Sequence, residues 1–386
     1  MQPLAGIRVL DFSTLLPGPL ASLFLAEAGA EVIKIERPGA GDEMRGYEPR
    51  FGDDSANFAL LNRGKGSVAI DLKSPDALVR LTPLLKTADV LIEQFRPSVM
   101  QRLGLGYDAV QAINNRIIYC SITGFGQDGP RADTAGHDLN YLALTGLLSF
   151  TADRDGAPTM PPTPIADIAA GSYPAVVNIL LALLQRQLTG EGSRLDISIT
   201  DSLFVLAYWG LAGGFAAGRW PRPGSELVTG GSPRYRIYRT RDGGYVAAAP
   251  IEQRFWENFC PLIGLSEEYC NDRRDPVCTI AAVAARIAAQ PTDHWRHVFA
   301  DADACCAVVA TLAEAVNDPH FRSRGLFCCE TASAGQTMPA LPLPIQEPFR
   351  DRVLIKSAPP LGADNNRVGT AVQRHARQDR RGGKRR

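Results

Sequence analysis

Residues 7–35 read IRVLDFSTLLPGPLASLFLAEAGAEVIKI, and this stretch decides the fold. Its opening is apolar and partly β-branched, which predicts a strand over 7–12. Apolar residues at helical spacing predict a helix over 19–28, and a second β-branched run predicts a strand over 31–35. Strand, helix and strand in this order predict a βαβ unit, the building block of a parallel sheet.

The same alternation continues along the first half of the chain. Further strands are predicted at 67–72, 89–93, 116–122 and 194–199, and helices at 76–87, 99–103, 139–150 and 165–188. Helices that alternate with apolar strands cover a parallel sheet, so the sequence predicts an α/β fold with a Rossmann-like large domain.

The composition shifts at about residue 221, where Gly and Pro cluster as far as 231. Two short strand-like runs, 234–238 and 244–248, flank a turn with the sequence Arg-Asp-Gly-Gly, which predicts a hairpin. Helical patterns follow the hairpin, so we expect a smaller α+β domain. The expected division is a large domain that begins with 1–215, a small domain at 225–330, a segment at 331–365 that returns to the large domain, and a basic, disordered tail at 366–386.

The charge balance limits the classes of partner. The 386 residues include 41 Lys+Arg and 41 Asp+Glu, so the chain has no general field to attract nucleic acid or an anionic membrane surface. No secretory pattern opens the sequence, and the apolar run at 175–184 is shorter than the roughly 20 residues of a membrane span. The eight cysteines contain no CxxC pair, which favours the reducing cytoplasm over a zinc or disulfide framework.

Two glycine motifs suggest nucleotide binding but lack its context. Residues 124–129 match GxGxxG, yet Pro130 follows where a dinucleotide fold needs a helix N-terminus. The stretch around Gly64-Lys65 lacks the preceding glycine of a phosphate loop, because Ala59 stands there. We therefore predict turns at both places.

Three acidic segments are better candidates for chemistry. They contain His137 with Asp138, then Asp167, and then Glu252, and each acid stands ahead of a predicted helix. A carboxylate at a helix start often only caps the helix. This structural role explains Asp138, Asp167 and Glu252 as well as a role in chemistry does. His137 has no such routine use at a helix start, so structure alone accounts for it least well.

Several motifs together resemble the family III CoA-transferases. They are Leu10-Asp-Phe12, Gly18-Pro19, Val32-Ile-Lys-Ile-Glu-Arg-Pro38 with Gly41-Asp42, Ile70-Asp-Leu-Lys73, Glu93-Gln-Phe-Arg-Pro97 and Gly124-Phe-Gly126. That family includes the α-methylacyl-CoA racemases, and Gly136-His-Asp-Leu-Asn-Tyr141 is similar to the racemase branch, whereas transferases commonly lack this histidine.

The resemblance implies an enzyme that acts on the 2-position of an acyl-CoA thioester, with no prosthetic group and no metal. His137 and Asp167 would remove and return the α-proton on opposite faces, and Glu252 would orient His137. The alternative is a CoA-transferase in which Asp167 attacks the thioester and forms an aspartyl-CoA intermediate. The family forms interlocked dimers, so we expect a homodimer in which Glu252 of one chain completes the other chain's site.

The resemblance also implies where the CoA lies. The residues expected around it are Arg37, Arg96 and Arg102 at the phosphates, Ile70, Asp71, Leu72, Lys73, Gln94 and Phe95 at the adenosine, and Gly136, Asp138 and Tyr141 near the thioester. The helix start at Asp138 would present N–H groups to the enolate oxygen. The acyl group itself cannot be read from these motifs.

Overall fold

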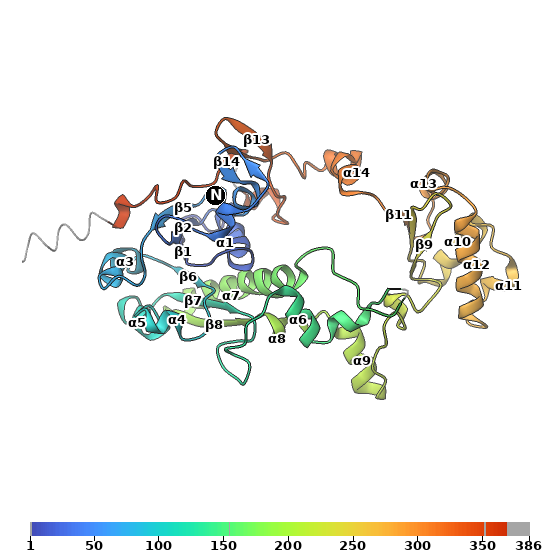
Figure 1. Cartoon of the computed structure of the whole chain (residues 1–386), viewed down its shortest axis with the longest axis horizontal. Helices are drawn as coiled ribbons and strands as arrows, with labels where there is room; N and C mark the ends of the chain where they lie inside the picture. The colour runs from blue at the N-terminus through green and yellow to red at the C-terminus, as the bar shows by residue number, and fades with distance from the viewer. Residues whose placement is uncertain (1, 154, 351–352, 369–386) are drawn as a thin grey trace, which may run out of the picture. The chain divides into compact units, whose positions relative to one another are not determined.

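The computed structural model describes residues 2–153, 155–350 and 353–368 (Figure 1). It contains two compact units. Unit 1 comprises Met1–Thr145, Pro161–Leu206 and Arg322–Arg386, and unit 2 comprises Gly146–Met160 and Ala207–Phe321. Nearly all of the basic tail lies outside the described residues, so its predicted disorder stays a prediction.

The centre of unit 1 is a six-stranded sheet in which every neighbouring pair is parallel. Its strands are β1 (Arg8–Asp11), β2 (Glu31–Glu36), β5 (Gly66–Ala69), β6 (Val90–Glu93), β7 (Ile118–Thr123) and β8 (Ser193–Ser198). Their spatial order is β5-β2-β1-β6-β7-β8, the order of a doubly wound Rossmann sheet. The predicted α/β fold with a parallel central sheet is confirmed. From β1 to β5 the strands are added on one side of β1, and from β6 to β8 they are added on its other side. Ligands bind at the point between β1 and β6 where this order switches.

Helices cover both faces of this sheet (Figure 1). On one face lie α3 (Ala77–Leu85), α4 (Val99–Arg102) and α5 (Tyr107–Ile113), and on the other lie α1 (Pro17–Glu27) and α7 (Tyr173–Thr189). Buried side chains such as Leu10, Leu81, Leu91 and Val110 join the sheet to the first group of helices. The strands are therefore fixed on both sides, which holds the loops at their carboxyl ends in place.

A π-helix, η3 (Ala166–Ser172), runs directly into α7. Together they form a 24-residue helical stretch, Ala166–Thr189, which by length and composition is long and apolar enough to cross a membrane. The helical stretch is therefore longer than the apolar run at 175–184, which the sequence analysis judged too short to span a membrane. It packs against α1, β7 and β8, as a core helix does. Pro174 is the second residue of α7 and follows the π-helix directly, so its missing N–H removes one hydrogen bond at the junction of the two helices.

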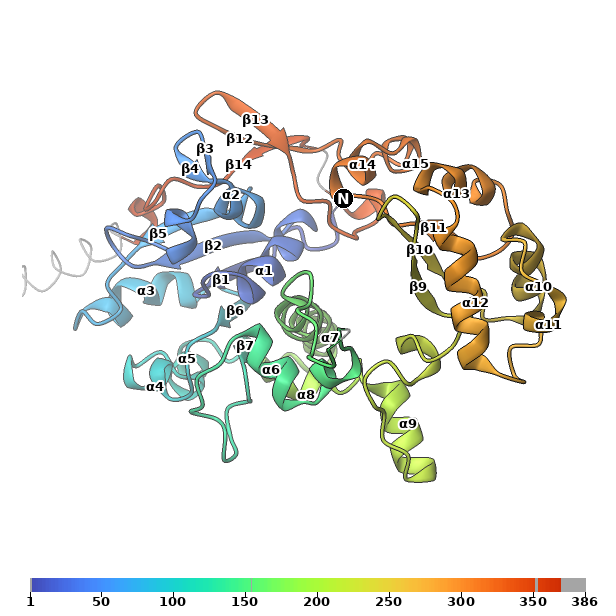
Figure 2. The same ribbon diagram turned by 45° about the vertical axis from the view of Figure 1, so that its right-hand side comes forward.

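Unit 2 has its own core around a three-stranded antiparallel sheet (Figure 2). The predicted hairpin is present as β9 (Arg236–Arg239) and β10 (Tyr245–Ala248), and β11 (Cys306–Val308) pairs with the second strand. Helices α10 (Gln253–Leu262), α12 (Pro276–Ala288) and α13 (Thr292–Phe299) supply buried aromatic side chains, among them Trp256 and Trp295.

The two units differ in extent from the expected domains. Residues 146–160 and 207–215 were expected in the large domain but group with unit 2. One reason is that the backbone N–H of Gly224 donates to the carbonyl oxygen of Phe150, at 3.0 Å. The remaining elements of unit 2 are η2 (Leu147–Phe150), α9 (Tyr208–Ala217), η4 (Leu227–Thr229), α11 (Glu267–Cys270) and α14 (Leu312–Asn317).

Smaller elements complete unit 1. They are η1 (Glu43–Gly46), β3 (Arg50–Phe51), β4 (Asp54–Ser55), α2 (Ala56–Asn62), α6 (Asp138–Leu144), α8 (Ile199–Leu203), β12 (Glu330–Ser333), β13 (Gln336–Pro339), η5 (Glu347–Phe349) and β14 (Ile355–Ser357), with α15 (Pro319–Ser323) at the boundary to unit 2. The C-terminal segment returns to the sheet, because the side chain of Asp364 accepts from the backbone N–H of Ser67 at 2.9 Å.

Candidate active site

A cavity of about 430 Å³ opens at the carboxyl ends of β1, β6 and β7 in unit 1. Its walls come from the loop after β1, from the chain after β6, from the end of β7, and from the segments that carry His137 and Asp167. This is the switch point of the sheet, where the strand order predicts a ligand. The volume falls in the range that holds a small organic molecule.

His137 lies at the rim of the cavity, at the N-cap position of α6. Its backbone N–H donates to Oδ1 of Asn140 at 3.0 Å, which fixes the start of the helix. The residue is exposed, so it is accessible to a ligand. Asp138 is therefore the first residue of the helix and not its cap.

Asp167 lies in the π-helix η3 and lines the same cavity. Its backbone N–H donates to Oδ1 of Asp138 at 2.9 Å, so Asp138 tethers the turn that carries Asp167. A π-helix is uncommon and occurs mostly at functional sites, because its wide turn displaces one residue from the regular helix face. The structure thus brings His137 and Asp167 to one cavity.

The electrostatics of this pair of acids suit proton transfer. Burial raises the pKa of Asp167 from its usual 3.8 to about 7, and the charge of Asp138 adds to the effect. Burial likewise raises the pKa of Asp138. For Tyr141, burial and then the charge of Asp167 raise the pKa to about 12, so its hydroxyl keeps its proton. Asp167 can therefore both hold and release a proton near neutral pH.

Other predicted residues also line the cavity. They are Gln94, Phe95, Arg96, Gly136 and Tyr141. The Tyr141 hydroxyl donates to the carbonyl oxygen of Gly136 at 2.6 Å, and its ring meets that of Phe125 edge to face. Oε1 of Gln94 accepts from the backbone N–H of Gly18 at 3.0 Å, so Gln94 joins two walls of the cavity.

The remaining predicted CoA contacts lie elsewhere in unit 1. Arg37 is exposed after β2, donates from Nε to the carbonyl oxygen of Gly41 at 3.0 Å, and lies 3.8 Å from Glu43. Asp71 and Lys73 are exposed after β5, Leu72 is half-buried, and Arg102 is exposed at the end of α4. The Ile70 side chain is buried in the core cluster. None of these residues lines the cavity that holds His137 and Asp167.

Glu252 belongs to unit 2, where it occupies the N-cap position of α10 with an exposed side chain. Its carboxylate makes no capping hydrogen bond to the helix. Its predicted role beside His137 stays a prediction.

Two features of the site were missed by the sequence analysis. Thr14, Leu15 and Pro17, in the loop after β1, form one wall of the cavity. Ser172 is fully buried, and its Oγ donates to the carbonyl oxygen of Pro17 at 2.8 Å and lies 3.2 Å from that of Asp167. The position of the loop after the first strand was an available signal, since such loops bind ligands in α/β folds.

No cluster of three or more His, Cys, Asp or Glu side chains arranged for a metal ion occurs within residues 2–153, 155–350 and 353–368.

Comparisons with known proteins give one family for nearly the whole chain. The sequence profile described as CoA-transferase family III matches residues 4–365. The alpha-methylacyl-CoA racemase of Homo sapiens is 36% identical over 328 residues, which cover 84% of this chain and 82% of that protein. The succinyl-CoA:glutarate CoA-transferase of Mus musculus is 36% identical over 312 residues, which cover 78% of this chain and 70% of that protein.

The fold has solved relatives. The crystal structure of a CAIB/BAIF family protein from Brucella suis superposes with a TM-score of 0.81 at 28% identity. The match covers 95% of this chain and 98% of that one. Among the sequence relatives, the racemase and the CoA-transferase named above are thus equally similar to this chain, at 36% identity each.

Proposed function

Because the chain belongs to CoA-transferase family III, we propose that it is an acyl-CoA racemase that inverts the 2-position of an acyl-CoA thioester. Its relatives include both racemases and CoA-transferases, so it is an enzyme of one of these two types. The observation that carries the proposal is that His137 and Asp167 line one cavity at the switch point of the sheet.

The reaction needs two groups that exchange a proton with the same carbon. A thioester acidifies its α-carbon because the enolate is delocalised, so a base can remove the proton from one face and an acid can return one to the other. His137 and Asp167 would fill these two roles. A carboxyl whose pKa is raised to about 7 by burial and by Asp138 can act as the base in one direction of this exchange and as the acid in the other.

The CoA would lie along the carboxyl edge of the sheet. Arg96 lines the cavity and would contact a phosphate or the pantetheine arm, while Arg37 and Arg102 are exposed guanidinium groups elsewhere in unit 1. Asp71, Leu72 and Lys73 would border the adenosine. The substrate is a CoA thioester, and the proposed chemistry uses no prosthetic group.

The second candidate is a CoA-transferase, favoured by relatives of that type at similar identity. In that reaction the carboxylate of Asp167 attacks the donor thioester, which forms a mixed anhydride and releases the CoA thiolate. The thiolate then attacks the aspartyl carbonyl, which gives an aspartyl-CoA and frees the donor acid, and the acceptor acid takes the CoA by the reverse of these two steps. Both candidates place Asp167 beside the thioester. They differ in whether the α-proton exchanges with solvent.

We also propose that the chain works as a homodimer in the cytoplasm. One face of α7 exposes Tyr173, Val177, Leu181, Leu184 and Leu188, of which Leu188 is 90% exposed. Such an apolar face is unusual for a monomer surface and suits burial against a second copy. In the dimer, Glu252 of one chain would lie beside His137 of the other chain and orient its imidazole.

The test is a pair of incubations in D₂O with a 2-methylacyl-CoA, one of them containing free succinate as acceptor. Mass spectrometry follows deuterium at the α-carbon and CoA on the acceptor. The racemase proposal expects rapid α-deuterium incorporation without succinyl-CoA. Succinyl-CoA without α-deuterium would reject it in favour of the transferase.

A further inference from the structure

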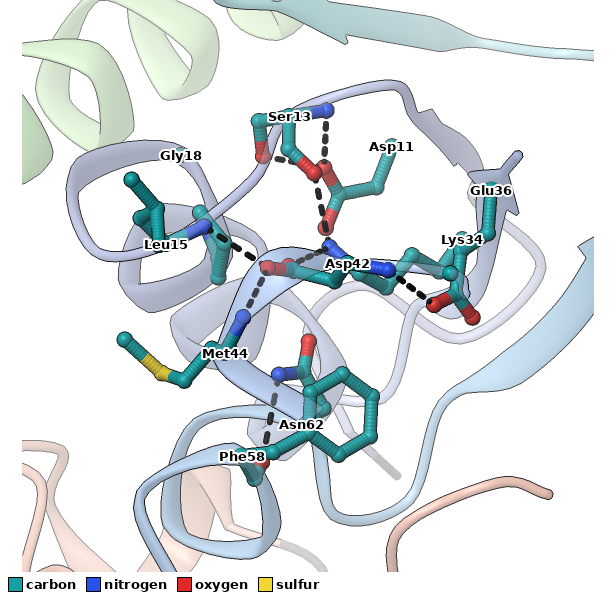
Figure 3. Close-up of polar contacts among 12 residues, drawn as sticks. Asp11, Ser13, Leu15, Gly18, Lys34, Glu36, Asp42, Met44, Phe58 and Asn62 are labelled. Atoms are coloured by element: carbon teal, nitrogen blue, oxygen red, sulfur yellow. Dashed lines mark hydrogen bonds and ion pairs between the residues drawn. The ribbon is translucent and has the colours of Figure 1, made fainter. Parts of the chain in front are cut away.

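We propose that Lys34 and Asp42, which touch neither His137 nor Asp167, are positioning residues that clamp the cavity loop Ser13–Pro17 against the helix turn of Asp167. This inference rests on the proposed function, because it gives that loop a part in the same site. Lys34 lies on β2, the strand that pairs with β1, and Asp42 is the N-cap of η1 in the chain after β2 (Figure 3).

The clamp begins with an ion pair that has no contact with water. Nζ of Lys34 lies 2.8 Å from Oδ2 of Asp42, and both side chains are 0% exposed. Charges are rarely buried without a reason, because removing each from water costs several kcal/mol. Lys34 is moreover the one charged residue inside the apolar run Val32–Ile35 of β2, where an apolar side chain would serve packing alone.

Each member of the pair holds one polar backbone group of the loop (Figure 3). Nζ of Lys34 donates to the carbonyl oxygen of Ser13 at 2.7 Å. Oδ1 of Asp42 accepts from the backbone N–H of Leu15 at 3.2 Å and from that of Met44 at 3.0 Å. The loop is thus fixed at two positions, one on either side of Thr14, which lines the cavity.

The loop conformation requires such a constraint. Leu15 has a φ of 61°, in the left-handed region that residues with a Cβ rarely adopt. The loop is also tight, because a Cβ on Gly18 would lie 2.2 Å from Cβ of Ser13. A strained residue persists only where its surroundings determine it, and the bond from Leu15 to Asp42 supplies that constraint.

The clamped loop reaches the catalytic turn. Its Pro17 carbonyl oxygen accepts from Oγ of Ser172, which also lies 3.2 Å from the carbonyl oxygen of Asp167. Thr14, Leu15, Pro17 and Asp167 line the same cavity. A displacement of the loop therefore changes both the cavity wall and the support of Asp167.

A second buried pair of a lysine and an aspartate lies behind the loop. Nζ of Lys65 lies 3.3 Å from Oδ2 of Asp11, both side chains are fully buried, and the hydroxyl and N–H of Ser13 donate to Oδ1 of Asp11. Burial alone would raise the pKa of Asp11, but Lys34, Lys65 and the serine hydrogen bonds outweigh it and lower this pKa to about 2. Asp11 therefore stays charged and keeps Ser13 facing this pair.

The main test removes both charges of the clamp at once, in the variant Lys34→Met/Asp42→Asn. The change leaves no unpaired buried charge, and the Asn oxygen can still accept from Leu15, but the tether to Ser13 is lost. The matched control is Arg186→Met/Asp89→Asn, which neutralises a partly buried ion pair of unit 1, 2.8 Å long, that does not contact the loop.

We expect kcat for α-proton exchange to fall about 10-fold or more relative to the control, since small displacements at a site have effects of this size. Amide hydrogen exchange of residues 13–16 should become faster in the clamp variant only, and the midpoint of urea unfolding should stay close to that of the control. A kcat within twofold of the control, together with unchanged exchange of the loop, would overturn the proposal.

Two measurements keep the result independent of folding and of the proposed function. In the unaltered protein the Leu15 amide should exchange as slowly as the amides of β1. If it instead exchanges as fast as an amide in an exposed turn, the clamp is rejected, even if the variant cannot be purified. Should the protein show neither racemase nor transferase activity, faster loop exchange in the variant still supports the clamp, while only the proposed function fails.

Discussion

Replacing Asp167 by Asn should stabilise the protein at alkaline pH while it abolishes the interconversion of the two enantiomers. Asn has the size of the neutral acid and cannot ionise. In the folded protein burial and Asp138 raise the pKa of Asp167 from 3.8 to about 7, so the native state holds a proton that the unfolded chain releases. The native protein therefore loses stability as the pH rises from 3.8 to about 7, and the loss is complete above that range.

The size of the effect follows from the same values. A rise from 3.8 to about 7 corresponds to an upper bound of roughly 4 kcal/mol, at about 1.4 kcal/mol per pKa unit. The side chain keeps some contact with solvent, which screens part of the effect, so we expect the variant to gain about 2 kcal/mol. The gain should be present above about pH 8 and absent below about pH 4.

Urea unfolding of both proteins at these two pH values, at equal protein concentration, measures the difference. The Asp128→Asn variant, changed on the exposed chain after β7, controls for the general effect of removing an aspartate. The reasoning is refuted if Asp167→Asn has the same free energy of unfolding relative to the parent at both pH values, or if it is less stable than the parent at the higher one.

Three further predictions concern the neighbours of this residue and the assembly. Asp138→Asn removes a charge that raises the pKa of Asp167, so the limb of the pH–rate profile that Asp167 governs should move to lower pH, and an unmoved limb contradicts the coupling. Ser172→Ala leaves the buried Pro17 carbonyl without its donor, so kcat/KM should fall about 10-fold while Ser172→Thr retains more activity. Leu184→Lys places a charge on the exposed face of α7 and should shift sedimentation from dimer to monomer, whereas a monomeric parent protein would contradict the proposed dimer.

The parallel sheet could be predicted because its strands are short runs of apolar and β-branched residues separated by helical patterns. That reasoning placed β1, β2 and β6 to within a few residues. Local patterns alone left Asp138, Asp167 and Glu252 open to a reading as helix caps. The resemblance to the family implied that His137 and Asp167 share one site, and both line one cavity in the structure.

Contacts between distant segments could not be read in the same way. The bond from the Asp167 amide to Asp138 depends on a π-helix that no periodicity announces. The ion pair of Lys34 with Asp42 joins a strand to the turn that follows it, and the bend between them is set by tertiary packing. A lysine inside an apolar strand was the available sign of that pair.

The measurement that tests the central claim most directly is α-deuterium incorporation into each enantiomer of a 2-methylacyl-CoA, supplied separately to the parent protein, to His137→Gln and to Asp167→Asn. If the two residues serve opposite faces, the parent protein labels and interconverts both enantiomers. Each variant then labels only one enantiomer, a different one in each case, and interconverts neither. Interconversion that survives His137→Gln, or CoA transfer to succinate without α-deuterium in the parent protein, would contradict the account.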